Sequence, residues 1–193
     1  AEEREFLEKH IREKERKRLE RKEHEDVYVR LAREALEYHV QTGERLVLPE
    51  GLPPELCEER AGAFVSLKID GKLRGCIGTI MPTQDCVGEE IIENAISAAV
   101  RDRRFPPVTP EELPLLTYSV DILGEPEHIE SMDQLDVKRY GVIVQSGLKR
   151  GLLLPDLAGV DTPQDQVHIA LQKAGIPSHV NYTMERFEVI RHF

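Results

Sequence analysis

The chain has 193 residues and a mass of 22.0 kDa, enough for one domain with a sizeable core or two small subdomains. Its 26 Lys and Arg residues stand against 36 Asp and Glu, which gives a formal net charge of −10 at pH 7. Nucleic-acid binding is therefore disfavoured, because a protein that neutralises phosphates needs a basic surface. No apolar run approaches the roughly 20 residues that span a bilayer, so we expect no membrane association.

The three cysteines, Cys57, Cys76 and Cys86, form no CxxC pair and are odd in number. Free thiols in a reducing cytoplasm are the simplest explanation, and no signal-peptide pattern opens the sequence. The seven histidines include no HxxxH pair and no Cys/His cluster at zinc-finger spacing. We therefore predict a cytoplasmic protein with no metal site and no cofactor.

Residues 1–25 form a separate compositional block that carries nine Lys and Arg residues and nine Glu residues. The block is neutral, so the net charge belongs to residues 26–193. Interleaved charges of this kind favour a solvated helix with i,i+4 ion pairs. Its apolar residues are too sparse for a coiled-coil seam, and we interpret the block as a helical extension rather than an oligomerisation helix.

From residue 27 the pattern becomes amphipathic, and apolar residues at helical spacing predict a helix from Val27 to Val40 that Gly43 ends. A proline-rich loop follows. Alternation over 65–69 then predicts a strand, and Asp70-Gly71 predicts a type I′ turn into a second strand over 72–80.

The rest of the chain continues to alternate between helical and strand patterns. The expected elements are a helix over 85–102 before a double proline, a short helix capped by Thr109 and Glu112, a strand over 116–122, a helical turn at Ser131–Gln134, a hairpin of 141–145 with 151–154, a helix from Thr162 to Gly175, and a strand near 186–191. This mixture of elements predicts an α+β protein.

Two segments share the pattern Gly-x-x-Arg-Gly, namely Gly71–Gly75 and Gly147–Gly151. Each begins at a turn between two strands and precedes a loop with proline and then a helix. We infer a duplicated hairpin-plus-helix unit with Arg74 and Arg150 in equivalent places. Gly75 and Gly78 lie within a strand pattern, which indicates a bulge, a bend or the close approach of another group.

The sequence Leu73-Arg74-Gly75-Cys76-Ile77-Gly78 resembles the signature of the AMMECR (AMME chromosomal region) domain family. Further similar blocks are Gly62–Lys68, Asp102 with Arg104–Pro107, Glu112–Pro114, Gly151–Pro155 and Lys173–Gly175. The similarity covers residues 27–193 in order. The ending from Tyr182 to Val189 is most similar to the prokaryotic branch called AmmeMemoRadiSam system protein A.

The resemblance implies an α+β fold of two unequal subdomains around one barrel-like sheet, with the domain spanning residues 26–193. It also implies a cytoplasmic three-part system with a Memo-like protein and a radical SAM enzyme. It supplies no established activity, and a fold alone does not specify one. The oligomeric state stays open.

We expect an accessory or binding subunit that holds a small anionic ligand or a partner segment at the LRGCIG surface. The candidate ligand- or partner-binding residues are Leu73, Arg74, Gly75, Ile77, Gly78, Thr79, Arg104, Phe105, Arg150, Gly151 and Pro155. Guanidinium groups suit carboxylates and phosphates, which favours an anion. The alternative for these arginines is ordinary ion pairing with Asp102, Asp121 or Glu112.

An alternative function is thiol-dependent catalysis with Cys76 as the nucleophile. On a regular strand Arg74 shares a face with Cys76, and a neighbouring cation lowers a thiol pKa. Against this, free cysteine is often a buried packing residue, and no Cys–His spacing supports a dyad. A nucleic-acid-linked regulator is a weaker alternative because of the acidic charge.

Overall fold

The computed structural model describes residues 2–193, without the side chains of residues 18, 21 and 22. The helices are α1 (Glu2–His24), α2 (Val27–Thr42), α3 (Pro54–Glu58), α4 (Val87–Val100) and α5 (Pro163–Ala174), with 3-10 helices η1 (Pro110–Leu115) and η2 (Met132–Gln134). The strands are β1 (Ala63–Ile69), β2 (Lys72–Gly78), β3 (Leu116–Leu123), β4 (Glu127–Ile129), β5 (Gly141–Ser146), β6 (Lys149–Leu153), β7 (Thr183–Phe187) and β8 (Val189–His192). The fold is α+β, as predicted.

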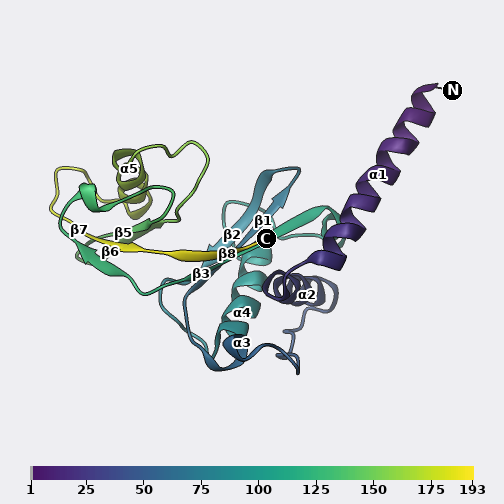
Figure 1. Ribbon diagram of the computed structural model, residues 1–193, viewed down its shortest axis with the longest axis horizontal. Helices are drawn as coiled ribbons and strands as arrows, with labels where there is room; N and C mark the ends of the chain where they lie inside the picture. The colour runs from purple at the N-terminus through teal and green to yellow at the C-terminus, as the bar shows by residue number, and fades with distance from the viewer. Residues whose placement is uncertain (1) are drawn as a thin grey trace.

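The strands form two four-stranded antiparallel sheets, in the orders β2-β1-β3-β8 and β4-β7-β5-β6. We call the first sheet with α2, α3 and α4 the N-lobe, and the second sheet with α5 the C-lobe (Figure 1). The resemblance implied one barrel-like sheet, and the described residues form no closed barrel. The chain instead leaves one sheet after Phe187 and joins the other at Val189, so the last predicted strand is two strands with Glu188 between them.

Each lobe has its own apolar core, and a third cluster joins them. In the N-lobe, α2 and α4 pack on one face of the sheet, where Val65 and Leu67 are fully buried. In the C-lobe, α5 packs on β5 and β6. The joining cluster centres on Phe187, which is 1% exposed, and the N-lobe side chains Phe64 and Ile80 pack against it. Burial of this cluster opposes separation of the lobes.

The predicted hairpins are both present, and glycine conformation explains their turns. Asp70 and Gly71 have φ angles of 50° and 76°, as a type I′ turn between β1 and β2 requires. The second hairpin joins Ser146 to Lys149 through a two-residue loop in which Gly147 has a φ of 60°. Each hairpin is followed by the helix that covers it, α4 or α5.

The two arginine–glycine repeats place a glycine at the same kind of helix contact in both lobes. A Cβ atom on Gly75 would lie 2.3 Å from the carbonyl oxygen of Ala98 in α4. A Cβ atom on Gly151 would lie 2.3 Å from the carbonyl oxygen of Ala170 in α5. Each helix backbone therefore rests directly on a glycine of its hairpin, which is what a duplicated unit would produce.

Local sequence signals fix several helix ends. Gly43 ends α2 with a φ of 76°, and its N–H donates to the carbonyl of His39. The Thr162 hydroxyl accepts a hydrogen bond from Asp165 N–H at the start of α5, and Gly175 ends that helix. The proline-rich loop differs from expectation because Pro54 begins the short helix α3 within it.

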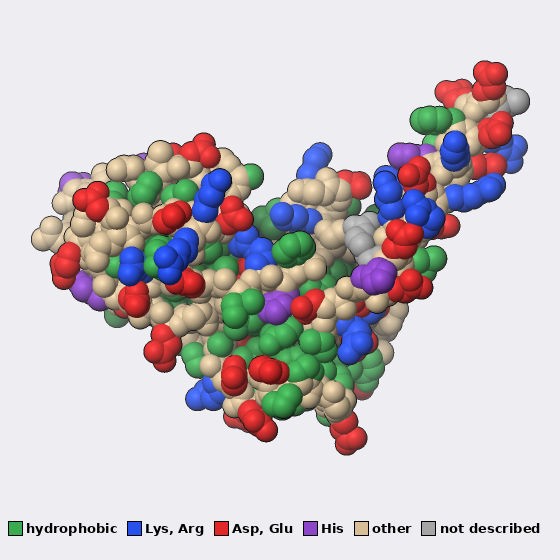
Figure 2. Space-filling view, in the orientation of Figure 1, with side chains coloured by type: hydrophobic (Ala, Val, Ile, Leu, Met, Phe, Trp, Pro, Cys, Tyr) green, Lys and Arg blue, Asp and Glu red, His purple; other side chains and the backbone are tan. Residues whose placement is uncertain are grey.

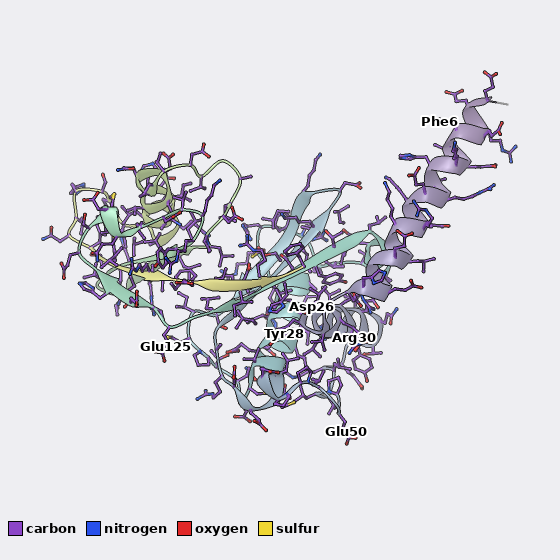
Figure 3. All side chains as sticks on the ribbon, in the orientation of Figure 1. Phe6, Asp26, Tyr28, Arg30, Glu50 and Glu125 are labelled. Atoms are coloured by element: carbon purple, nitrogen blue, oxygen red, sulfur yellow. The ribbon has the colours of Figure 1, made fainter. Side chains whose placement is uncertain are left out.

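The helix α1 projects from the N-lobe, with Phe6 near its outer end (Figures 1 and 3). Its described side chains are exposed, and i,i+4 ion pairs such as Arg16–Glu20 follow its surface, as the interleaved charges predict. No helix in residues 2–193 is long and apolar enough to span a bilayer.

Candidate ligand-binding site between the lobes

One face of the N-lobe sheet carries a row of small polar side chains. The ladder pairs Ser66 with Cys76 on β2 and with Ser119 on β3. Because side chains alternate along a strand and Val65 and Leu67 are buried against α4, these three side chains lie on the opposite face. We call Cys76, Ser66 and Ser119 the polar row.

Cys76 is held within this row by a side-chain contact and a backbone contact. Its Sγ atom lies 3.2 Å from the Ser66 hydroxyl, and its backbone N–H donates to Asp102 Oδ2 at 3.0 Å. Burial raises the pKa of the Cys76 thiol, and the Ser66 contact and the charges of Arg104 and Lys173 only partly oppose this effect. A raised pKa keeps the thiol protonated near neutral pH.

Asp102 anchors the loop after α4 to the strand β2. Besides the Cys76 N–H, its carboxylate accepts from Arg104 N–H (3.1 Å), Nε (3.0 Å) and NH2 (2.8 Å). Hydrogen bonding to the Arg104 side chain is the main reason that the pKa of Asp102 falls to about 2. The pair fixes Arg104 beside Cys76, with its guanidinium more than half exposed.

A cation from the C-lobe faces the same place. Lys173, in the last turn of α5, interacts electrostatically with both Cys76 and Arg104. Partial desolvation and repulsion by Arg104 lower the pKa of Lys173. No Asp or Glu lies within ion-pair distance of Lys173 in the described part of the chain. Figure 2 shows Lys and Arg side chains gathered in the notch between the lobes.

A buried ion pair within the N-lobe sheet lies on the same face, and its arginine also contacts the C-lobe. Asp121 on β3 is 1% exposed and accepts from Arg191 Nε on β8 at 2.7 Å. Arg191 NH2 also donates to the carbonyl of Pro155 at 3.1 Å, in the loop after β6. Burial raises the pKa of Asp121, and the Arg191 guanidinium opposes that rise. Pro155, a predicted site residue, thus meets this face through its backbone.

Arg74 does not share a face with Cys76 in the way that a regular strand would allow. The register shifts between Leu67 and Lys68, which pair with Gly75 and Leu73, so Arg74 is the extra residue of a β-bulge. Its guanidinium makes a bidentate ion pair with Glu112, through Nε–Oε2 (2.7 Å) and NH2–Oε1 (3.0 Å). The cation beside Cys76 is Arg104 instead.

Each of the three arginines predicted for the site lies within ion-pair distance of a carboxylate. Arg74 pairs with Glu112 and Arg104 with Asp102, which are the ordinary ion pairs considered as the alternative. Arg150 belongs to the other sheet and lies 3.6 Å from Glu185.

Most of the other predicted site residues have packing roles. Gly75 and Gly151 allow helices to pack closely on their strands, and the Phe64 ring covers Gly78. Ile77 packs against the N-lobe core, and Phe105 packs beneath Arg104. The Thr79 hydroxyl accepts a hydrogen bond from Asn94, whereas Leu73 is exposed on the hairpin. Sequence reasoning did not select Ser66, Ser119 or Lys173 as site residues. Strand register could have indicated the two serines, whereas nothing local indicates that α5 faces β2.

The AMMECR1 family matches residues 29–192. This chain belongs to the AMMECR1 family. It is 50% identical over 173 residues to protein CA_C1420 of Clostridium acetobutylicum, covering 89% of this chain and 37% of that protein. It is also 48% identical over 171 residues to a protein of Thermotoga maritima, covering 85% of this chain and 98% of the relative.

A solved structure supports the same family assignment and the two-sheet fold. The crystal structure of the uncharacterized protein PH0010 from Pyrococcus horikoshii matches with a TM-score of 0.79 and 35% identity. The match covers 85% of this chain and 88% of that one. None of the names of these AMMECR1 relatives states an activity.

Proposed function

We propose that this AMMECR1 protein is a cytoplasmic binding subunit that holds a small anion, or an anionic group of a partner, between its lobes. What supports this is one observation: Arg104 and Lys173 come from different lobes, and both interact electrostatically with Cys76 although they repel each other. Repulsion between like charges costs free energy, and an anion that interacts with both charges offsets this cost. The surrounding protein is acidic, which makes the local excess of cations more distinctive.

The binding groups of the proposed site are two cationic side chains and two hydroxyl groups. Arg104 is oriented by Asp102 and so loses little side-chain freedom when it meets an anion. Lys173 supplies a second cationic group, an ammonium from the C-lobe. The hydroxyls of Ser66 and Ser119 lie on the same face of the N-lobe sheet as Cys76, and both can donate hydrogen bonds to an oxyanion. A phosphate or carboxylate group suits these donors.

The raised pKa of Cys76 favours binding over thiol catalysis. A nucleophilic cysteine needs a depressed pKa or an adjacent base, and burial acts here in the opposite direction. The hydrogen bond to Ser66 gives the protonated thiol a packing role in the floor of the site. We therefore keep the thiol-dependent enzyme as the less supported alternative.

The direct test uses inorganic phosphate and citrate as probes. We expect either anion to shift the backbone amide NMR signals of Cys76 and Arg104, and Lys173→Gln to weaken that binding by about tenfold. Lys138→Gln, which removes an exposed lysine elsewhere in the C-lobe, is the matched control and should bind as the parent does. Equal binding by the parent and Lys173→Gln, or no shift at these amides, would contradict the proposal.

We further propose that the site serves the three-part system that the family resemblance implies, with a Memo-like protein and a radical SAM enzyme as partners. The three purified proteins should form a complex in sedimentation velocity, and Lys173→Gln should weaken it. A parent protein that binds neither partner, with or without phosphate, would remove this part of the proposal while leaving anion binding intact.

A further inference from the structure

A cavity lies along the β3 edge of the N-lobe sheet, between that edge and α2. It has a volume of about 510 Å³ and is bounded by the α1–α2 junction, α2, η1 and β3. All four residues of β3 from Leu116 to Ser119 line it. Ser66 lines it too, so two of the three residues of the polar row border the cavity, without Cys76. Phe193, which follows β8, also lines it.

The cavity follows a stretch of β3 that has no partner strand on one side. β8 pairs with β3 only over Val120–Leu123, whereas β3 begins at Leu116. Leu123 N–H donates to Gly62 on the β1 side, and Gly124 N–H donates to Glu188 on the β8 side. Because hydrogen-bond direction alternates along an antiparallel strand, Tyr118 presents its N–H and C=O on the β8 side, beyond the last pair. This is an open sheet edge.

The side chain of Tyr118 has a hydroxyl group at the same place that also lacks a hydrogen-bond partner. Its Oη atom is buried, and no group in the described part of the chain makes a hydrogen bond to it. Burial raises the pKa of this phenol, so the hydroxyl stays protonated and can donate. A buried polar atom without a partner is costly, and a bound molecule that supplied one would gain accordingly.

The wall of the cavity formed by the start of α2 carries more negative than positive charge, whereas Lys68 of β1 lines the opposite side. Arg33 on α2 makes a bidentate ion pair with Glu25 and a single hydrogen bond, of 3.3 Å, to Glu37. The three side chains are between 10% and 25% exposed. Two carboxylates therefore share one guanidinium in a partly desolvated place, which favours a further cation. Val29 lies one turn before Arg33 on the same face of α2 and offers an aliphatic surface.

The strand β8 shows how a neighbour of β3 reaches α2. His192 pairs with Val120, and its ring stacks on Tyr28 at a centroid distance of 3.9 Å. Its Nδ1 atom lies 2.8 Å from Asp26, which is labelled with Tyr28 at the start of α2 in Figure 3. Two positions further along this ladder, a residue opposite Tyr118 would point to the same face. There it would meet Val29 and the Glu25–Arg33–Glu37 group.

We propose that the open edge of β3 binds an extended peptide segment of a partner protein, which adds a strand opposite Tyr118. The residue opposite Tyr118 is a lysine or arginine. Its aliphatic stem packs on Val29 and the Tyr118 ring, and its cationic end meets Glu25 and Glu37. The main-chain groups of Tyr118 supply the strand hydrogen bonds, so backbone pairing provides affinity and the cavity provides the preference for a basic residue.

The test follows one backbone amide. We expect Tyr118 N–H to exchange with solvent faster than Thr117 and Ser119 N–H, which bond to β1. An acetylated and amidated hexapeptide that alternates threonine with lysine should slow exchange at Tyr118 and shift its NMR signal. The same peptide with glutamate in place of lysine should leave Tyr118 unchanged. Equal effects of the two peptides would overturn the proposed chemistry.

Two variants and one control complete the test. Glu37→Gln should weaken the lysine peptide by about tenfold, and Tyr118→Phe should weaken it without changing the fold. Tyr140→Phe, in the C-lobe, should have no effect. No response at Tyr118 up to millimolar peptide would overturn the proposal. So would a Tyr118 amide that is already protected in a dimer seen by sedimentation, because a second copy would then occupy the edge. Phosphate binding at Cys76 is read from different amides, so either proposal can fail alone.

Discussion

Replacing Asp102 by asparagine should reveal how strongly the carboxylate organises the anion site. Asp102 is 6% exposed and receives four hydrogen bonds, from Cys76 N–H and from three groups of Arg104. Lowering its pKa from 3.8 to about 2 corresponds to roughly 2 kcal/mol of folding free energy at pH 7. For a chain of this size we expect Asp102→Asn to lower Tm by roughly 4–8 °C.

The pH dependence provides the sharper check. Because the folded-state pKa lies below the unfolded-state value, the contribution is complete above about pH 5 and disappears as pH falls toward 2. Urea denaturation of parent and variant should therefore differ by roughly 2 kcal/mol at pH 7 and by about 1 kcal/mol at pH 3. Glu188→Gln, which removes an exposed partner of Arg139, should leave the unfolding midpoint unchanged. The same loss at both pH values, or none at pH 7, would refute the electrostatic reasoning.

Three further predictions concern packing and burial. Gly75→Ala should lower the free energy of unfolding by about 2 kcal/mol or more, because its Cβ would meet a helix carbonyl at 2.3 Å. Gly124→Ala should cause a smaller loss, because the nearest neighbour of its Cβ lies at 3.4 Å, and thermal unfolding compares the two variants. Cys76 should react slowly with an alkylating reagent and show an apparent pKa above that of an ordinary thiol, while the exposed Cys57 reacts readily. An apparent pKa of Cys76 below the ordinary value would restore the thiol-enzyme hypothesis. Asp121→Asn should lower the free energy of unfolding at pH 7 by less than Asp102→Asn does, because burial raises the pKa of Asp121. A larger loss for Asp121→Asn in urea denaturation would contradict this prediction.

Local chemistry made much of the fold predictable. The Asp70-Gly71 turn, the end of α2 at Gly43 and the cap at Thr162 each depend on a few neighbouring residues. Gly75, the last residue of the first arginine–glycine repeat, was predicted to mark a bulge, a bend or a close approach, and the Ala98 carbonyl above it shows the close approach. Gly151, in the second repeat, was not singled out in this way, although α5 rests on it likewise. Such signals require no knowledge of distant contacts.

The site was harder to predict because it depends on register and on contacts between lobes. One extra residue in β2 turns Arg74 away from Cys76. The glycines of this strand indicated a bulge, a bend or a close approach, but they did not specify that Arg74 would be the extra residue. Lys173 interacts electrostatically with Cys76 across the two lobes, and no local sequence signal indicates such an interaction. The change of sheet at Glu188 also escaped prediction, since strands on both sides of one residue look like a single strand in sequence.

The position of β8 has a consequence for synthesis of the protein. The N-lobe sheet takes its fourth strand from residues 189–192, after the whole C-lobe has been made. A ribosome-bound chain can therefore assemble β1, β2 and β3 early, but Asp121 stays without Arg191 until residues 189–192 have been made. During that interval the nascent N-lobe presents a longer unpaired edge and a buried acid without its base. Completion of the sheet is thus coupled to completion of the second lobe, so a prematurely ended chain exposes both defects to the proteases that remove unfinished proteins.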